Sequence, residues 1–88
     1  MVTVFIPANF RSFSSGRDRV EVEGRTLRQV IDQLDKECPG LKDQVVVDDA
    51  IRPGLAVAID EDLASEGLLQ PVPDGGTIHI LPAMGGGA

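Results

Sequence analysis

The residues with the clearest chemical potential are the small ones at the end of the chain: Pro82, Ala83, Met84, Gly85, Gly86, Gly87 and Ala88. Glycine has no Cβ and little to bury, so we expect this segment to be disordered when free. Fully extended, the six residues after the proline reach at most ~20 Å, and such a backbone can carry a carboxylate into a narrow enzyme channel. The pattern predicts a tail that serves as a substrate. A frayed end or a cloning remnant is the alternative that composition leaves open.

Few other side chains could do chemistry. Cys38 is the only cysteine, so it cannot form an internal disulfide, and one thiolate is too few for a zinc or iron–sulfur site. Its helical spacing from Leu34 predicts a position in the core. His79 has no cysteine or carboxylate partner close to it in the sequence, which is typical of a surface residue. We expect this chain to have no catalytic residue, no metal and no bound cofactor.

The charge balance narrows the choice of partners. Eight basic residues against fourteen acidic ones give a net charge of −6, without a cluster of Lys or Arg. Nucleic acid binding needs a basic footprint, so we exclude nucleic acid; a basic protein partner and simple solubility are both compatible with the charge. The longest apolar runs are about five residues, against the ~20 of a membrane helix, and no signal peptide precedes the first strand. We expect a cytoplasmic protein that does not contact a membrane.

The first half of the chain predicts a hairpin followed by one helix. Alternating apolar residues predict strands at residues 2–6 and 19–23, joined by a serine-rich turn. A capping box at residues 26–29 begins the helix, and Pro-Gly at residues 39–40 ends it, so we place the helix at residues 27–37. Its apolar residues recur at helical spacing: Leu27, Val30, Ile31, Leu34 and Cys38.

The second half carries weaker signals. We interpret residues 41–54 as irregular, with a possible short strand at the three valines, and residues 55–59 as the third strand. The acidic run at residues 60–62 indicates an exposed turn, and residues 68–72 a short edge piece. Residues 77–81 predict the last strand, which a proline ends.

Together these elements predict an α+β fold, with a mixed four- to five-stranded sheet packed on one main helix. The domain spans residues 1–82, the tail spans residues 83–88, and the first and last strands lie side by side at the sheet centre. Phe5, His79 and Leu81 alternate with core-facing residues, so they point away from the helix. We expect an exposed, partly apolar patch beside the root of the tail, where a partner protein docks.

The whole chain resembles the MoaD/ThiS family of sulfur carriers, over nearly all of its 88 residues. The resemblance rests on a few motifs: Val4 to Ala8 leading to Phe10 and Arg11; Pro39, Gly40 and Leu41 after the helix; the strand end Val57 to Asp60; Pro73, Asp74 and Gly75 before Ile78 to Pro82; and the closing run from Leu81 to Gly87. It implies a ubiquitin-like β-grasp fold and a carrier that is not itself an enzyme.

The resemblance also implies where the chemistry takes place. The family's terminal glycine pair falls on Gly86 and Gly87. A ubiquitin-activating-like adenylyltransferase/sulfurtransferase would adenylate the Gly87 carboxylate with ATP and convert it to a thiocarboxylate. A sulfur-accepting synthase would then take the sulfur. The family serves molybdopterin, thiamine and cysteine biosynthesis, and this tail is closest in style to the carriers of cysteine synthesis.

Ala88 departs from the family pattern, because it follows the glycine pair. Related carriers with extra C-terminal residues are matured by a metalloprotease, so the resemblance implies that Ala88 is removed. Two other functions stay open. The chain could be a ubiquitin-like modifier conjugated to lysines of other proteins, or a β-grasp binding domain without tail chemistry.

Overall fold

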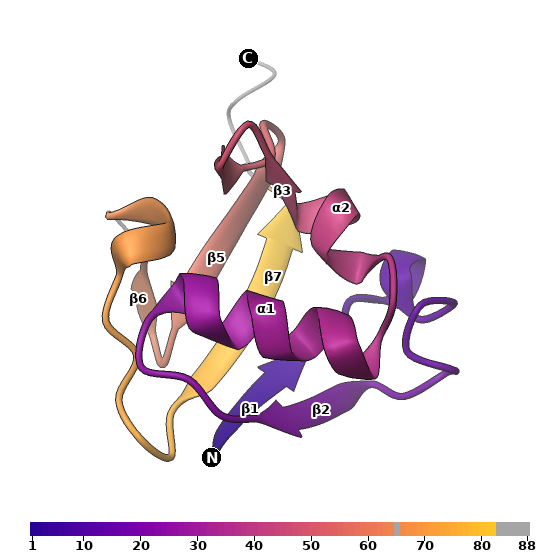
Figure 1. Cartoon of the computed structure of the whole chain (residues 1–88), viewed down its shortest axis with the longest axis horizontal. Coiled ribbons are helices and arrows are strands. Elements are labelled where there is room, and N and C mark those ends of the chain that lie inside the picture. Colours follow the sequence, from indigo (N-terminus) through magenta and orange to yellow (C-terminus); the bar gives the residue numbers. More distant parts are fainter. Residues whose placement is uncertain (65, 83–88) are drawn as a thin grey trace.

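A five-stranded mixed sheet with one long helix across one face forms the framework of the protein (Figure 1). The computed structural model describes residues 1–64 and 66–82. Among these residues, no helix is long and apolar enough to cross a membrane. The elements are, in order, β1 (Val2–Phe5), η1 (Ala8–Phe10), β2 (Arg19–Val22), α1 (Leu27–Glu37), α2 (Leu41–Val45), β3 (Val46–Val47), β4 (Ala50–Ile51), β5 (Leu55–Ile59), β6 (Asp62–Leu63), η2 (Gly67–Leu69) and β7 (Thr77–Pro82).

β1 and β2 form the predicted N-terminal hairpin. The two strands pair antiparallel, with Val4 opposite Val20. The amide of Ile6 extends the ladder by donating to the carbonyl of Asp18 at 2.8 Å, and Pro7 then ends it, since proline has no N–H. The valines of both strands are buried, so the alternation in the sequence gave the inner face of this hairpin correctly.

The sheet order is β2-β1-β7-β5-β6, so the first and last strands are neighbours, as predicted. β1 and β7 run parallel, with Val4 opposite Ile78, whereas β5 pairs antiparallel with β7. A parallel pair needs a crossover, and α1 lies within the connection between β1 and β7. This mixed sheet with one main helix confirms the predicted β-grasp fold.

α1 begins and ends at the predicted residues. The Thr26 hydroxyl accepts a hydrogen bond from the Gln29 amide at 3.3 Å, which caps the first turn. The Gln29 side chain reaches back one residue further than in the usual capping box, because its Oε1 accepts from the Arg25 amide at 2.9 Å. After the helix, Gly40 adopts a left-handed φ of 93°, which glycine adopts without steric cost.

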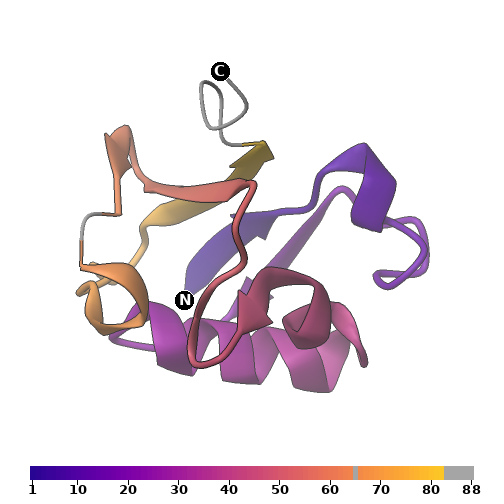
Figure 2. The ribbon, with the colours of Figure 1, turned by 90° about the horizontal axis from the view of Figure 1, so that it is seen from above.

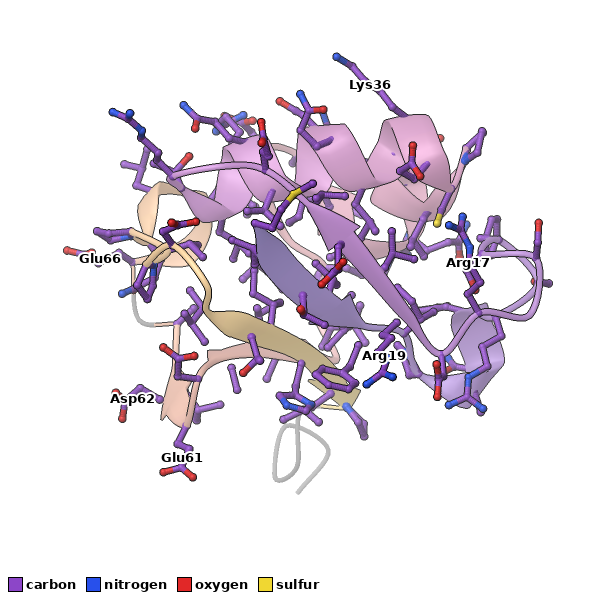
Figure 3. The ribbon with its side chains drawn as sticks, turned by 90° about the horizontal axis from the view of Figure 1, so that it is seen from below. Arg17, Arg19, Lys36, Glu61, Asp62 and Glu66 are labelled. Atoms are coloured by element: carbon purple, nitrogen blue, oxygen red, sulfur yellow. The ribbon has the colours of Figure 1, made fainter. Side chains whose placement is uncertain are left out.

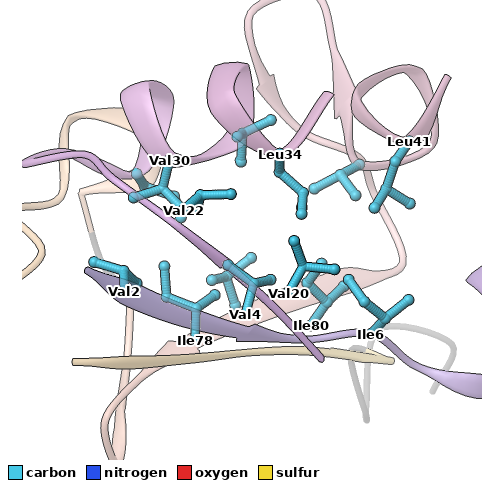
Figure 4. Close-up of a cluster of buried hydrophobic side chains, with 14 of the residues drawn as sticks. Val2, Val4, Ile6, Val20, Val22, Val30, Leu34, Leu41, Ile78 and Ile80 are labelled. Atoms are coloured by element: carbon cyan, nitrogen blue, oxygen red, sulfur yellow. The ribbon is translucent and has the colours of Figure 1, made fainter. Parts of the chain in front are cut away.

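The core lies between α1 and the inner face of the sheet (Figures 2 and 4). Figure 4 shows side chains from both layers meeting there, among them Val4, Leu34 and Ile78, each 1% exposed. The apolar residues predicted for the helix face are all buried, Cys38 included. Close packing also explains Gly24, because a Cβ at this residue would lie 2.7 Å from the backbone nitrogen of Val30.

The possible short strand at the three valines is confirmed as β3, but the interpretation of the rest of residues 41–54 as irregular was wrong for most of the segment. It contains the short helix α2 and a two-stranded hairpin, β3–β4, which forms a sheet of its own. The hairpin turn is made by Asp48 and Asp49, with φ of 52° and 63°. Two successive left-handed residues are the signature of a type I′ turn, in which Asn-Gly is the usual pair. The Asp-Asp pair therefore gave a weaker signal.

The edge strand also lies elsewhere than predicted. Residues 68–72 were expected as a short edge piece, but they contain the end of η2 and a single bridge between Thr26 and Pro71. The edge is β6, which follows the acidic turn directly and pairs with the end of β5. The acidic run is exposed as predicted, although its last residue belongs to β6. β7 includes Pro82, opposite Leu55, because a proline at the last position of a strand costs no interior ladder bond.

Candidate functional site

The outer face of the sheet, away from α1, carries the predicted patch. Phe5 and His79 are opposite residues on the parallel strands β1 and β7. Their rings are stacked, with centroids 4.6 Å apart and an interplanar angle of 0°. Both residues are half-buried, whereas Leu81, two residues further along β7, is 39% exposed. The structure therefore brings the three predicted residues together on one face.

The patch is wider than the sequence indicated. Ala58 on β5 is opposite His79, and Leu63 on β6 is opposite Ala58, so a row of side chains crosses the sheet. Leu63 is 67% exposed, and its place in this row makes it part of one contiguous surface. We call these residues the outer patch: Phe5, Ala58, Leu63, His79 and Leu81. Sequence reasoning missed Leu63 because it ended the third strand at the acidic run and recognised no strand after it.

Charged residues flank the outer patch on two sides. Arg19 is opposite Phe5 at the β2 end of the row. Glu61, on the turn before β6, and Asp62, the first residue of β6, lie at the other side of the molecule (Figure 3). Asp60 has a structural role instead, because its carboxylate accepts from the Thr77 amide at 3.0 Å and so supports the start of β7. An apolar centre between a basic and an acidic margin favours a protein partner with the opposite arrangement.

The root of the tail lies beside the outer patch. Leu81 and Pro82, both exposed, are the last two residues of β7 and pair with Ala56 and Leu55. The rest of the predicted reactive segment lies outside the described residues: Ala83, Met84, Gly85, Gly86, Gly87 and Ala88. The structure thus describes the surface beside the root of the tail and the strand position of Pro82, the last residue before the tail.

The remaining reactive groups are structural. Cys38 is fully buried, and its Sγ accepts from Nη2 of Arg17 at 3.8 Å. Burial raises the pKa of the Cys38 thiol, with Arg17 acting in the opposite direction. A buried, protonated thiol is a poor nucleophile. In residues 1–64 and 66–82, no three His, Cys, Asp or Glu side chains come together to form a metal site.

Comparison with known sequences places these features in a family. The sequence model of the ThiS family matches residues 4–87. Sulfur carrier protein CysO of Mycobacterium tuberculosis is 34% identical over 93 residues, an alignment that covers 98% of each chain. The match therefore spans the sheet, the helix and the glycine pair of the tail.

Solved structures agree with this assignment. A chain in the crystal structure of the Amycolatopsis orientalis BexX/CysO complex is 32% identical, with a TM-score of 0.91 over 96% of this chain and 97% of that one. The small archaeal modifier protein 1 of Haloferax volcanii has a TM-score of 0.72 at 22% identity, over 94% of this chain and 97% of that one. The second likeness is one of fold alone.

Proposed function

This chain belongs to the ThiS family, and on that premise we propose that it is a sulfur carrier of the CysO kind, which hands sulfur to a synthase in cysteine biosynthesis. The observation that carries the proposal is the family match, which runs from β1 to Gly87 and includes the glycine pair of the tail. The carrier itself catalyses nothing. It presents a carboxylate to enzymes that do.

The proposed reaction has two steps at the Gly87 carboxylate. A carboxylate is a poor electrophile, so a partner enzyme first joins it to the α-phosphate of ATP and releases pyrophosphate. Hydrosulfide then attacks the acyl carbon of the adenylate. The new C–S bond forms as the C–O bond to AMP breaks, so AMP leaves and a thiocarboxylate remains. The residues next to the reacting carbon are glycines, which suits a narrow channel because they carry no side chain.

The outer patch supplies the docking surface in this proposal. It presents Leu63 and Leu81 to solvent and ends beside Pro82, so a partner bound there would lie within reach of the tail. In the processed chain, the five residues from 83 to 87 span at most ~18 Å beyond Pro82 when extended. For CysO of Amycolatopsis orientalis, the complex with BexX is an example of partner binding.

Residues after the glycine pair would have to be removed before activation. Ala88 moves the carboxylate outward by ~3.3–3.6 Å, and a misplacement of about 1 Å can cost ~100-fold in rate. The family match ends at residue 87, which supports Gly87 as the reacting residue. We propose that a metalloprotease exposes it, so that maturation controls entry into the cycle.

The test is ATP–pyrophosphate exchange with the adenylating enzyme of the same organism. We expect exchange with a chain that ends at Gly87 and at least ~100-fold less with a chain that ends at Ala88. In the Gly87 chain, Phe5→Asp should strongly reduce exchange, because it places a charge in an apolar contact. Gln33→Asp, which adds the same charge on the exposed side of α1, is the matched control and should leave exchange unchanged.

Each contrary result has a definite meaning. Equal exchange with both chain ends would refute processing, and no exchange with either would favour a binding domain without tail chemistry. Intact mass then separates a carrier from a protein modifier. A thiocarboxylate adds ~16 Da to the chain, whereas a modifier appears in high-mass conjugates with lysines of other proteins.

A further inference from the structure

The two edges of the sheet are not equivalent. β6 has two residues, too few to template another strand, whereas β2 has four and lies along the free margin of the sheet (Figure 1). An exposed edge strand presents unpaired N–H and C=O groups to any strand that can match it. The backbone and side-chain groups that β2 presents therefore determine which strand can pair with it.

The hydrogen-bonding pattern shows which backbone groups of β2 face outward. The Ile6 amide bonds to the Asp18 carbonyl, so in the alternating antiparallel ladder Val20 also faces β1. Arg19 and Glu21 alternate with it and direct their N–H and C=O groups to the open side. Thr3 on β1 is opposite Glu21, and its amide donates to the carbonyl of Gly76, on the side of β1 away from β2. Thr3 and Glu21 are therefore a pair without mutual backbone hydrogen bonds, as this alternation requires.

The side chains of Arg19 and Glu21 carry opposite charges. Arg19 and Glu21 are both exposed, on the outer face of the sheet. Within the part of the chain that the structure describes, neither has an ion-pair partner. When β2 is placed antiparallel to a second β2 with Val20 on the twofold axis, Arg19 of each copy lies opposite Glu21 of the other. Opposite charges at facing positions stabilise a strand pair, and like charges destabilise it.

We propose that β2 is a self-complementary edge through which two copies of this chain form a twofold dimer with one continuous sheet. The same residues supply the backbone hydrogen bonds and the two cross-strand ion pairs, in the same register. Such an interface is isologous, because one patch serves both subunits. Its small area makes the dimer weak and concentration-dependent.

The twofold axis of this dimer is perpendicular to the sheet, so both outer patches face the same side. The dimer would therefore present two docking surfaces to one partner assembly. The dimer does not require a thiocarboxylate, and its test is independent of the tail.

Association is measured by sedimentation equilibrium of the full chain, up to ~1 mM, at low salt. We expect the apparent mass to rise with concentration from 9.3 kDa toward about twice that value. The rise should be reduced at ~1 M NaCl, where the screening length is ~3 Å. Arg19→Glu and Glu21→Arg should each abolish the rise, because each places like charges opposite one another.

Two further samples restore the opposite charges across the strand pair. An equimolar mixture of the Arg19→Glu and Glu21→Arg variants pairs opposite charges again, and so does the double variant alone; both should regain the rise in mass. Lys36→Glu and Glu61→Arg make the same charge changes away from β2 and should associate like the wild type (Figure 3). A wild type that stays at 9.3 kDa, single variants that still associate, or a mixture that does not associate would each overturn the proposal.

Discussion

The two faces of the central sheet are made from the same strands yet carry different information. On β1, Val4 is 1% exposed and packs under α1, while its neighbour Phe5 is half-buried on the outer face against His79. On β7, Ile78 and His79 divide in the same way. Adjacent positions thus face either the helix or the open outer side of the sheet. The inner positions form the core on which folding depends, and the outer positions form the docking surface in the function proposed above.

The sharpest way to break this comparison is the same substitution at two adjacent residues. Val4→Asp puts an unpaired carboxylate into the core, at a cost of several kcal/mol, close to the whole stability of ~5 kcal/mol expected for a domain this small. We expect no cooperative thermal transition for this variant. Phe5→Asp removes a ring stack worth ~0.5–1.5 kcal/mol and should keep a cooperative transition at a slightly lower midpoint.

Circular dichroism melts of both variants, at matched concentration, check this prediction. Equal losses at the two positions would mean that the outer face also belongs to the core.

A pair of leucines sharpens the comparison at intermediate size. Leu34 is 1% exposed on α1, and Leu63 is 67% exposed on β6. Leu34→Ala leaves a cavity and should lower the free energy of unfolding by ~2–5 kcal/mol, whereas Leu63→Ala should change it by less than ~0.5 kcal/mol. Urea denaturation measures both values. A loss below half a kcal/mol for Leu34→Ala would show that the buried face of α1 is wrongly assigned.

The smallest expected effect concerns pH. Burial raises the pKa of the Cys38 thiol above its value in the unfolded chain. A raised folded-state pKa gives a stability contribution that is complete below the unfolded value, ~8.5, and is lost as the pH rises through the folded value. The free energy of unfolding should therefore fall more steeply above pH ~8.5 in the wild type than in Cys38→Ala. Identical alkaline profiles would contradict a desolvated thiol.

The sequence predicted the structure correctly where a residue type permits only one local conformation. The capping pair Thr26 and Gln29 determined where α1 begins, and Pro39 with Gly40 determined where it ends. The strict alternation around Val4 gave both faces of β1. In each case local geometry and tertiary packing favour the same conformation.

Prediction from the sequence failed where the local pattern was ambiguous and tertiary contacts determined the conformation. Asp48 and Asp49 adopt left-handed conformations without the glycine that would have indicated a hairpin, and one turn of α2 is too short to show a period. β6 exists because its two residues pair with the end of β5, which the sequence of Asp62 and Leu63 does not reveal. The candidate site shows the same division. Phe5 was predicted by alternation, and Leu63 was found only from strand pairing.

The position of β7 has a consequence for the synthesis of this protein. The strand that comes last in the chain lies in the middle of the sheet, between β1 and β5. A nascent chain that lacks residues 77–82 lacks the strand that joins the β1–β2 pair to the β5–β6 pair. The inner face of the sheet is then incomplete, and the core under α1 cannot close. Contacts this distant in sequence also slow folding. Folding is thereby coupled to the completion of translation, and a chain truncated before β7 remains unfolded and open to proteolysis.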